Sequence, residues 1–336
     1  MKSLDIVFSA SMEVTLQERT VDPPGAGEIL CQAELSLISI GTEMLSLAGV
    51  ADPGTNWSDF LRFPFTPGYS MVGRVIAFGD DVNGVREGDR ITARAGHRQF
   101  FKTTLQRLCP IPDAVSDEDA TWATLAQVAQ LGVRRAELRL GERAGIVGMG
   151  ILGQLVAQYL HLSGARQIVA IDPAEARLEL AKAHGATDVL PLGADAAYDP
   201  IRTLTGGAML DVIFDITGNP HVLAPASRLV RQLGRVILLG DTTTPSQQHL
   251  GSRIVADSVA ILGIHGSMFP AQASTFNPWT MQEMTALFFD YLAQGRMRVA
   301  DMVTHRVSPR EAPEVYLDLL KDRSSALGIV FDWSRL

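Results

Sequence analysis

Cysteine and long apolar runs are scarce in this chain. The two cysteines, Cys31 and Cys109, are far apart and flanked by apolar residues. They predict reduced, partly buried thiols of a cytoplasmic protein rather than a disulfide framework. No apolar run reaches the roughly 18 residues of a membrane span, so we expect no membrane partner. The N-terminal stretch has one lysine and no sustained apolar core, so we expect no signal peptide.

Basic residues are also few. The chain has 29 Lys and Arg against 37 Asp and Glu, a formal charge of −8 and a pI near 5.4. A nucleic-acid footprint needs clustered Lys and Arg, so we expect no nucleic-acid partner. Apolar residues, in contrast, are plentiful. They make up 46% of 336 residues, which is enough for a large core and predicts two domains.

The strongest motif is a glycine-spaced turn between a strand and a helix. The apolar pair Ile146 and Val147 predicts a buried strand, and apolar residues after the turn recur at helical spacing. In such a turn the first glycine permits a tight bend, the second lets the backbone approach a pyrophosphate, and the third lets the helix pack on the strand. The helix N-terminus then offers free N–H groups to phosphates. The cofactor-binding residues predicted here are Gly148, Gly150, Ile151, Leu152 and Gly153.

The predicted secondary structure changes along the chain. Residues 1–115 consist mostly of short runs of β-formers separated by turn signals, and residues 116–137 predict a helical region opened by an N-cap at Ser116. From residue 144 strands and helices alternate, which predicts an α/β domain with a doubly wound parallel sheet. Strands are predicted at 146–147, 167–172, 188–190, 211–216, 235–240 and 259–263, followed by a long loop at 264–280 and a helix at 281–294.

Asp172 ends the second of these strands. An acidic side chain there accepts hydrogen bonds from the adenosine ribose and repels a 2′-phosphate, which favours NAD(H) over NADP(H). Asp172-Pro173-Ala174-Glu175 is also a good helix start, with Asp at the N-cap and Pro at the first helical position. The two interpretations are compatible. No Lys or Arg follows immediately to neutralise a phosphate, so we predict NAD(H).

The layout resembles the medium-chain dehydrogenase/reductase superfamily, the kin of the zinc alcohol dehydrogenases, over nearly the whole chain. The residues that carry the resemblance are Ser39-Ile-Gly-Thr-Glu43, Pro67-Gly-Tyr-Ser-Met-Val-Gly73, Val85-Arg-Glu-Gly-Asp-Arg-Ile91, the glycine turn, Phe214-Asp-Ile-Thr-Gly218 and Val303-Thr-His-Arg306. The resemblance implies a GroES-like β-rich catalytic domain at 1–118 and 269–336 around a Rossmann NAD-binding domain at 119–268. It adds Thr217 and Gly240 to the cofactor site and implies a homodimer or homotetramer.

The departures from the family pattern concern zinc. Zinc members carry Cys where this chain has Ile40, and Gly-His-Glu where it has Gly68-Tyr69-Ser70, while the third ligand region falls at 123–125. A catalytic zinc needs three N, S or O ligands, and an Ile side chain offers none. Residues 92–108 contain no Cys, so the four-cysteine structural lobe is missing too. We therefore expect no zinc. Among zinc-free branches the chain resembles bacteriochlorophyllide C3-hydroxyethyl dehydrogenases and bacterial bi-domain oxidoreductases.

Without zinc, another group must stabilise the alkoxide or donate the proton. Thr42 matches the family's relay hydroxyl, although a turn residue that bonds local backbone is the simpler interpretation. Tyr69 replaces a zinc ligand and either donates a proton or fills space. His97 is a candidate acid or base, or a plain hydrogen-bonding residue. These three are the predicted catalytic residues.

Five further residues are predicted substrate contacts. Glu43 either orients a substrate hydroxyl or is simply solvated, and Gln127 either touches the nicotinamide or packs its helix. Trp57, Met268 and Phe269 lie in loops rich in aromatics, which predict either an apolar substrate mouth or buried anchors.

The sequence thus predicts a cytoplasmic, zinc-independent oxidoreductase that transfers hydride between NAD(H) and a secondary alcohol or ketone, such as a sugar, polyol or secondary-metabolite intermediate. An enoyl or quinone reductase is the second hypothesis, and Asp172 argues against it because such enzymes usually prefer NADPH. An inactive dinucleotide-binding sensor is the third.

Overall fold

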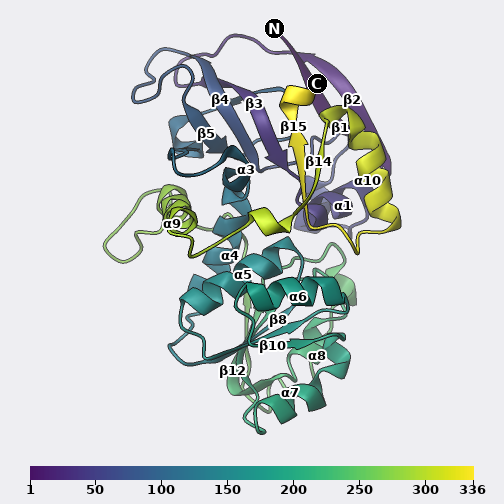
Figure 1. Ribbon diagram of the computed structural model, residues 1–336. Helices are drawn as coiled ribbons and strands as arrows, with labels where there is room; N and C mark the ends of the chain where they lie inside the picture. The colour runs from purple at the N-terminus through teal and green to yellow at the C-terminus, as the bar shows by residue number, and fades with distance from the viewer. The chain divides into compact units, whose positions relative to one another are not determined.

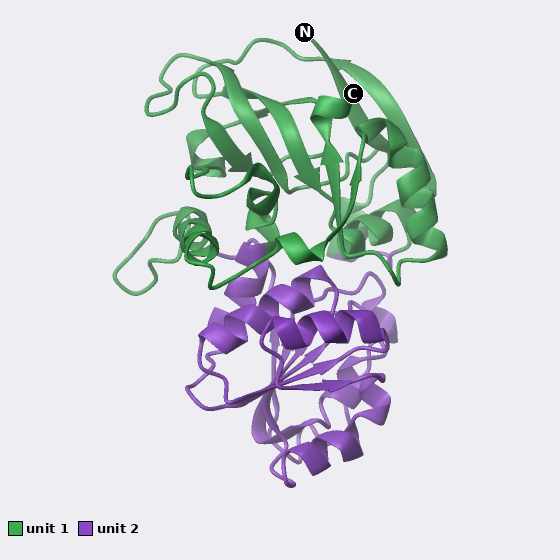
Figure 2. Cartoon of the chain, viewed as in Figure 1, with its two compact units in different colours: residues 1–50, 56–125, 270–336 green, residues 51–55, 126–269 purple.

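The computed structural model describes residues 1–336, which form two compact units (Figure 2). Unit 1 contains residues 1–50, 56–125 and 270–336, and unit 2 contains residues 51–55 and 126–269. The two ends of the chain therefore share one unit, and the boundaries fall at 125/126 and 269/270 where the sequence predicted 118/119 and 268/269.

Unit 1 is rich in β-structure (Figure 1). A two-stranded antiparallel hairpin is formed by β1 and β2, and a seven-stranded mixed sheet has the order β14-β15-β3-β4-β5-β7, with β6 paired to β3. The strands are β1 (Lys2–Ala10), β2 (Glu13–Thr20), β3 (Ile29–Leu37), β4 (Met71–Phe78), β5 (Arg90–Ala93), β6 (Phe100–Thr103), β7 (Leu108–Pro110), β14 (Val303–Val307) and β15 (Gly328–Asp332). This sheet matches the predicted GroES-like domain.

The helices of unit 1 are short. They are α1 (Ile40–Ala48), α2 (Asn56–Phe60), α3 (Asp117–Ala120), α9 (Met281–Ala293) and α10 (Ala312–Lys321). Helix α1 begins after Ser39 and ends at Gly49, whose left-handed conformation suits the C-terminal end of a helix. Helix α3 begins with the predicted cap, because the Ser116 hydroxyl accepts the Asp119 N–H.

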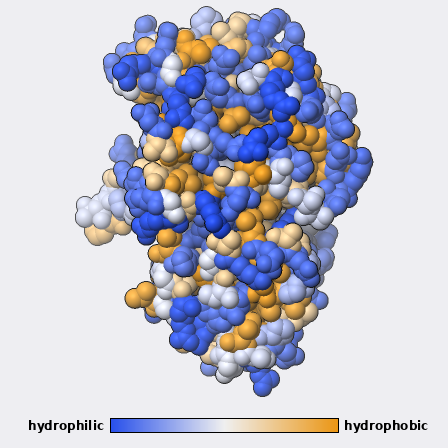
Figure 3. Space-filling model, viewed as in Figure 1, coloured by the Kyte–Doolittle hydropathy of each residue, from blue (hydrophilic) through white to orange (hydrophobic).

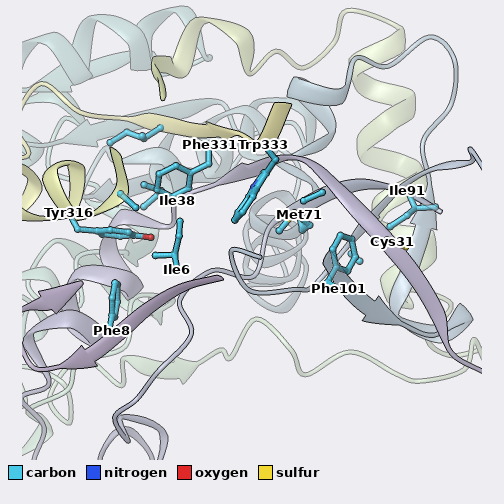
Figure 4. Packing of buried hydrophobic residues seen from close by; sticks show 14 of the residues in the cluster. Ile6, Phe8, Cys31, Ile38, Met71, Ile91, Phe101, Tyr316, Phe331 and Trp333 are labelled. Carbon is cyan, nitrogen blue, oxygen red and sulfur yellow. The ribbon is translucent and has the colours of Figure 1, made fainter. Parts of the chain in front are cut away.

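The core of unit 1 joins residues from both ends of the chain (Figure 4). Phe8 of β1 packs edge-on against Tyr316 of α10, with ring centroids 5.0 Å apart, and Phe331 of β15 lies 6.1 Å from Tyr316. Such aromatic pairs contribute roughly 0.5–1.5 kcal/mol beyond the burial of their area. This packing explains why the C-terminal stretch returns to the N-terminal unit.

Unit 2 contains a six-stranded, entirely parallel sheet with the order β10-β9-β8-β11-β12-β13. In chain order this is 3-2-1-4-5-6, the strand order of a Rossmann fold, and it confirms the predicted fold class. The strands are β8 (Arg143–Val147), β9 (Gln167–Ile171), β10 (Asp188–Leu190), β11 (Leu210–Asp215), β12 (Val230–Leu238) and β13 (Ala260–Gly263). The order reverses between β8 and β11, where ligands bind at the carboxyl ends of the strands in such sheets.

The helices of unit 2 connect these strands. They are α5 (Ile151–Leu162), α6 (Glu175–Ala183), α7 (Tyr198–Leu204) and α8 (Leu223–Ala226), while α4 (Ala123–Arg135) begins in unit 1 and continues in unit 2. The prediction that α6 begins with Asp172 as its N-cap was wrong by two residues. Ala174 holds that position, because Asp172 accepts the Ala174 N–H and forms a turn ahead of the helix. No helix in the structure is both long and apolar enough to cross a membrane.

Candidate active site

Three hydroxyl groups meet at the N-terminus of α1. The Tyr69 hydroxyl donates a hydrogen bond to Ser39 Oγ, and it lies 3.3 Å from Thr42 Oγ1. Ser39 is the residue directly before α1, Thr42 lies in the first turn of α1, and Tyr69 lies two residues before β4. Burial is the largest influence on the Tyr69 phenol and raises its pKa, although the hydrogen bonds from Ser39 and Thr42 partly counter it. The phenol is therefore protonated at neutral pH and is a proton donor.

The loop that carries Tyr69 is fixed by close backbone packing. Gly68 has φ +93°, and a Cβ there would meet the His97 ring at 2.7 Å, so only glycine fits. The backbone N–H of His97 donates to the Pro67 carbonyl at 2.8 Å, and Thr124 Oγ1 donates to the Tyr69 carbonyl at 3.1 Å. The direction of the Tyr69 ring is thus set by neighbours on both sides.

Beneath this cluster lies a buried carboxylate, Glu43, which is 1% exposed. Its Oε1 accepts the Ser39 N–H at 2.7 Å, and its Oε2 lies 3.1 Å from His97 Nε2 and accepts the Tyr316 hydroxyl at 2.5 Å. Burial and the neighbouring carboxylate raise the pKa of Tyr316 well above its usual value, so Tyr316 stays a donor. The three donors offset the cost of burying this acid.

The far side of His97 continues the network. Nδ1 of His97 lies 2.8 Å from Ser36 Oγ, and Trp333 Nε1 donates to the same Ser36 oxygen at 2.9 Å. A neutral His97 with its proton on Nε2 satisfies every contact, because it donates to Glu43 and accepts from Ser36. The indole, the hydroxyl, the imidazole and the carboxylate then form one directional chain of hydrogen bonds.

This geometry favours the hydrogen-bonding interpretation of His97, and it shows that Glu43 is buried rather than solvated. His97 is 0% exposed, both of its ring nitrogens are bonded, and its ring packs 5.1 Å from that of Phe331. The buried Glu43 has its carboxylate occupied by donors of its own unit. Neither side chain has a free face for a substrate. Both instead position α1 and the loop of Tyr69.

The remaining predicted substrate residues fall in both units. In unit 1, Trp57 packs edge-on against Phe60, and Phe60 packs against Phe65, so the aromatic loop is anchored to its own unit. In unit 2, Gln127 is 3% exposed on α4, Met268 is 69% exposed and Phe269 is half-buried. The apolar substrate mouth stays a prediction.

The residues at the family's zinc position do not fit a metal. Ile40 has no donor atom, and Tyr69 and Ser70 offer only hydroxyls. No group of three or more His, Cys, Asp or Glu in the structure is arranged to hold a metal ion. The two cysteines are both buried free thiols, and burial raises the pKa of Cys31 to about 12 and also raises that of Cys109.

The glycine turn of unit 2 has the shape that a pyrophosphate needs. Gly148 adopts φ +95°, and a Cβ on Gly153 would meet the Gly148 carbonyl oxygen at 2.1 Å. A Cβ on Gly150 would meet nothing within 4 Å, so the backbone faces open space there. Helix α5 begins at Ile151 without a side-chain cap, which leaves the N–H groups of Ile151 and Leu152 available to an anion. This arrangement fits the predicted dinucleotide.

Asp172 braces this turn. Its Oδ2 accepts the Met149 N–H at 2.7 Å and its Oδ1 accepts the Ala174 N–H at 2.8 Å. Each oxygen keeps a second lone pair for a ribose hydroxyl. Arg177 lies in helix α6, with its Nη1 4.0 Å from Asp172 Oδ2. The sequence has no Lys or Arg directly after Asp172, but the first turn of the helix brings this cation close to it.

The two other predicted cofactor residues lie at the ends of β11 and β12. The N–H and hydroxyl of Thr217 both donate to Asp215 Oδ1, at 3.0 and 2.7 Å. A Cβ on Gly240 would meet the Ile216 carbonyl carbon at 2.5 Å, so this glycine permits close packing of two strand ends. Both residues therefore shape the carboxyl edge of the sheet.

Comparison with known proteins identifies the family of the chain. A model of the alcohol dehydrogenase GroES-like domain matches residues 37–133, and a model of zinc-binding dehydrogenases matches residues 152–285. The 2-desacetyl-2-hydroxyethyl bacteriochlorophyllide A dehydrogenase of Cereibacter sphaeroides is 25% identical, with 99% of each chain covered. The chain belongs to the medium-chain dehydrogenase/reductase superfamily.

Other relatives are named as dehydrogenases of sugars and polyols. The D-guloside 3-dehydrogenase of Escherichia coli K12 is 27% identical over 282 residues, covering 80% of this chain and 78% of the relative. The sorbitol dehydrogenase of Bacillus subtilis is 28% identical, with 80% of each chain covered. These dehydrogenases support an oxidoreductase activity for this member of the superfamily.

Solved structures of the superfamily share the fold. The 2R,3R-butanediol dehydrogenase of Bacillus subtilis superposes with a TM-score of 0.81 at 19% identity, covering 98% of this chain and 99% of that one. A protein of Sinorhizobium meliloti 1021 described as a zinc-binding dehydrogenase was solved with NADP and has a TM-score of 0.79. A short chain alcohol dehydrogenase of Escherichia coli CFT073, with a TM-score of 0.80, was solved with NADH. These two structures are 18% and 17% identical to this chain, and each match covers 99% of both chains. At such identities the comparison shows a shared fold alone.

Proposed function

We propose that this chain is an NAD(H)-dependent dehydrogenase that interconverts a secondary alcohol and a ketone without zinc. The observation that carries the proposal is the hydroxyl cluster of Tyr69, Thr42 and Ser39, in which Tyr69 stands at a sequence position where zinc relatives carry a metal ligand. A polyol or sugar hydroxyl is the substrate class favoured by the relatives that oxidise D-gulosides and sorbitol.

The residues divide the work in the following way. The nicotinamide supplies the hydride for ketone reduction or takes it up in alcohol oxidation. The Tyr69 hydroxyl donates a hydrogen bond to the substrate carbonyl oxygen and passes its proton to that oxygen as negative charge develops. Thr42 and Ser39 hold the phenol in place, and the half-buried Thr42 passes it a proton taken from water, which replaces the proton given to the substrate. Glu43 fixes the backbone of Ser39 and so the start of α1.

Turnover tests this proposal directly. Purified protein is incubated with NADH and a panel of ketones, including ketoses and acyclic keto-polyols, and with an activated alkene and a quinone. Oxidation of NADH by ketones alone supports the proposal. Transfer of deuteride from labelled NADH to an alkene carbon supports the enoyl reductase instead, and cofactor binding without any turnover supports the sensor.

Cofactor choice depends on Asp172, and we expect Asp172→Ser to weaken NADH binding by about tenfold, because one ribose contact and the brace on Met149 are lost. We expect binding of NADPH to improve, since the carboxylate no longer repels the 2′-phosphate and Arg177 remains nearby. Calorimetric titration with both cofactors measures the change. Glu179→Ser on the exposed face of α6 is the matched control and leaves both affinities unchanged. Tighter binding of NADPH than NADH by the unaltered protein contradicts the assignment.

Metal content gives a second expected outcome. Protein purified from zinc-supplemented medium is expected to contain well under one zinc per chain, because neither Ile40 nor the hydroxyls of Tyr69 and Ser70 are adequate zinc ligands. Activity is expected to survive dialysis against a strong chelator. Stoichiometric zinc measured by plasma emission spectrometry contradicts the ligand argument.

We also propose a homodimer or homotetramer. Strand β13 is the edge of the parallel sheet and pairs only with β12, which leaves its outer backbone groups without a strand partner. Three large apolar side chains are 69–90% exposed: Leu233 lies in β12, and Leu250 and Val255 lie in the segment between β12 and β13. Figure 3 shows hydrophobic patches among hydrophilic side chains on the face in view. Light scattering on the purified chain measures the assembly, and a monomer at micromolar concentration contradicts it.

A further inference from the structure

Arg94 is a charged residue that no motif of the sequence brings forward. It follows β5 directly, and β5 pairs antiparallel with β4 so that Ala93 lies opposite Met71. Residue 94 and the two residues before Met71 therefore occupy the same end of this strand pair. Tyr69 and Arg94 thus lie at the same end of one strand pair, although they are far apart in the sequence.

The Arg94 side chain is half-buried, and its Nε is buried. Burial lowers the pKa of Arg94 from its usual value, and the attraction of Tyr69 counters that change. A guanidinium keeps its charge even so, because its intrinsic pKa is above about 12. The fold therefore holds a permanent positive charge within electrostatic reach of the phenol.

The groups around Tyr69 have opposite effects on the pKa of its phenol. Burial and the negative charge of Glu43 on α1 raise the pKa of the phenol, while Ser39 and Thr42 on α1 and the positive charge of Arg94 lower it. Glu43 is engaged with its own donors, and Arg94 is the cation among these groups. Removal of Arg94 leaves burial and Glu43 opposed only by neutral hydrogen bonds.

Alcohol oxidation depends on this balance. The O–H bond of the alcohol breaks and its proton forms a new O–H bond on the Tyr69 oxygen, while the hydride on the same carbon passes to the oxidised nicotinamide. The Tyr69 oxygen must be a phenolate to receive that proton, and ketone reduction regenerates the phenolate. A metal ion performs this stabilisation of negative oxygen in zinc members.

We infer that Arg94 is a positioning residue that acts through Tyr69. Its positive charge stabilises the Tyr69 phenolate and takes the place of the positive charge that a metal supplies elsewhere in the superfamily. The inference rests on the proposed function for its role in turnover. Its physical content, an interaction between Arg94 and the ionised phenol, stands independently of any substrate.

The kinetic test compares Arg94→Met with Arg94→Lys in alcohol oxidation across pH. The rising limb of kcat/KM is expected to move about one pH unit or more to alkaline in Arg94→Met, so that the rate at a fixed pH on that limb falls about tenfold. Arg94→Lys keeps the charge and is expected to move the limb by less than half as much. Arg98→Met, which removes a partly buried arginine paired with Asp5, is the matched control and leaves the limb unmoved. A loss of rate in Arg94→Met with the same pH profile as the unaltered protein overturns the inference.

A titration without substrate separates this inference from the proposed function. The chain has five tyrosines, and ¹³C-labelling of their ring Cζ gives one signal that Tyr69→Phe removes. That signal is expected to titrate at higher pH in Arg94→Met than in the unaltered protein, and an unchanged titration overturns the inference even if the enzyme is active. If no alcohol is oxidised, the proposed function fails while this titration still decides the role of Arg94. Arg94→Gln replaces Arg94→Met if thermal melting shows that the methionine variant is unfolded.

Discussion

Replacement of Tyr69 by phenylalanine is expected to lower kcat/KM for ketone reduction by about 10²–10⁴-fold. The phenylalanine keeps the ring and its packing but removes the hydroxyl that meets Ser39 and Thr42. No other hydroxyl in the cluster has the acidity of a phenol, so the developing alkoxide loses its proton donor. The loss is expected mainly in kcat, because the hydrogen bond strengthens as the carbonyl oxygen becomes negative.

The pH dependence of the unaltered enzyme follows from the same group. Burial raises the pKa of Tyr69, so the phenol is protonated throughout the neutral range. Reduction uses the protonated form and is therefore expected to be constant near neutral pH and to fall as pH rises through the Tyr69 pKa. Oxidation uses the phenolate and is expected to rise with pH. Tyr69→Phe is expected to flatten both dependences.

Initial rates of NADH consumption with a ketone and of NADH formation with an alcohol, each followed across pH, measure both effects. Tyr291→Phe is the matched control, because that ring lies on α9 beside Arg296 and has no part in the hydroxyl cluster. Its kcat/KM is expected to match that of the unaltered enzyme. Full activity in Tyr69→Phe would transfer the proton relay to Thr42 or to water and would reduce Tyr69 to a space-filling ring.

Local sequence patterns were sufficient for the fold and for part of the site. The spacing of the glycines predicted the geometry of the turn, because only glycine fits there. Gly148 has a positive φ, and Gly153 lies too close to the Gly148 carbonyl for a side chain. Alternating strands and helices predicted the parallel sheet, since a crossover helix is the usual connection between parallel strands. Thr42 and Tyr69 were predicted together from their places in the family pattern, and the structure places their hydroxyls 3.3 Å apart.

The environment of a polar residue was not predictable in the same way. The sequence around His97 contains nothing that distinguishes a buried imidazole from an exposed one, because its partners Ser36 and Glu43 lie 61 and 54 residues away. Tyr316 reaches Glu43 across 273 residues and belongs to no motif. Arg94 lies at the same end of a strand pair as Tyr69 through the register of β4 and β5, which local patterns leave unspecified. Contacts of this kind depend on tertiary packing.

The largest expected effect on stability comes from Glu43. Glu43→Leu is expected to lower the free energy of unfolding by about 3–5 kcal/mol, because it removes the common acceptor of three buried donors. The Ser39 N–H, the His97 Nε2–H and the Tyr316 hydroxyl would then lie in an apolar interior without their partner. Leucine has a suitable volume, so the loss reports the missing acceptor more than a cavity.

Two further variants separate the charge of Glu43 from its shape. Glu43→Gln is expected to lose less than Glu43→Leu, because the His97 ring can move its proton to Nδ1, accept from the new amide with Nε2 and donate to Ser36. Tyr316→Phe removes one donor and leaves the carboxylate with two, so a loss of about 1–3 kcal/mol is expected.

Urea denaturation followed by circular dichroism measures these losses, and an unchanged slope with denaturant shows that the unfolded state is not the cause. The matched control is Glu34→Gln in β3, whose carboxylate pairs with the partly exposed Arg74 and is expected to contribute at most about 1 kcal/mol. A loss of that small size in Glu43→Leu would show that the carboxylate does not hold α1 in place. Ser39 and Thr42 would then owe their position beneath the phenol to packing alone.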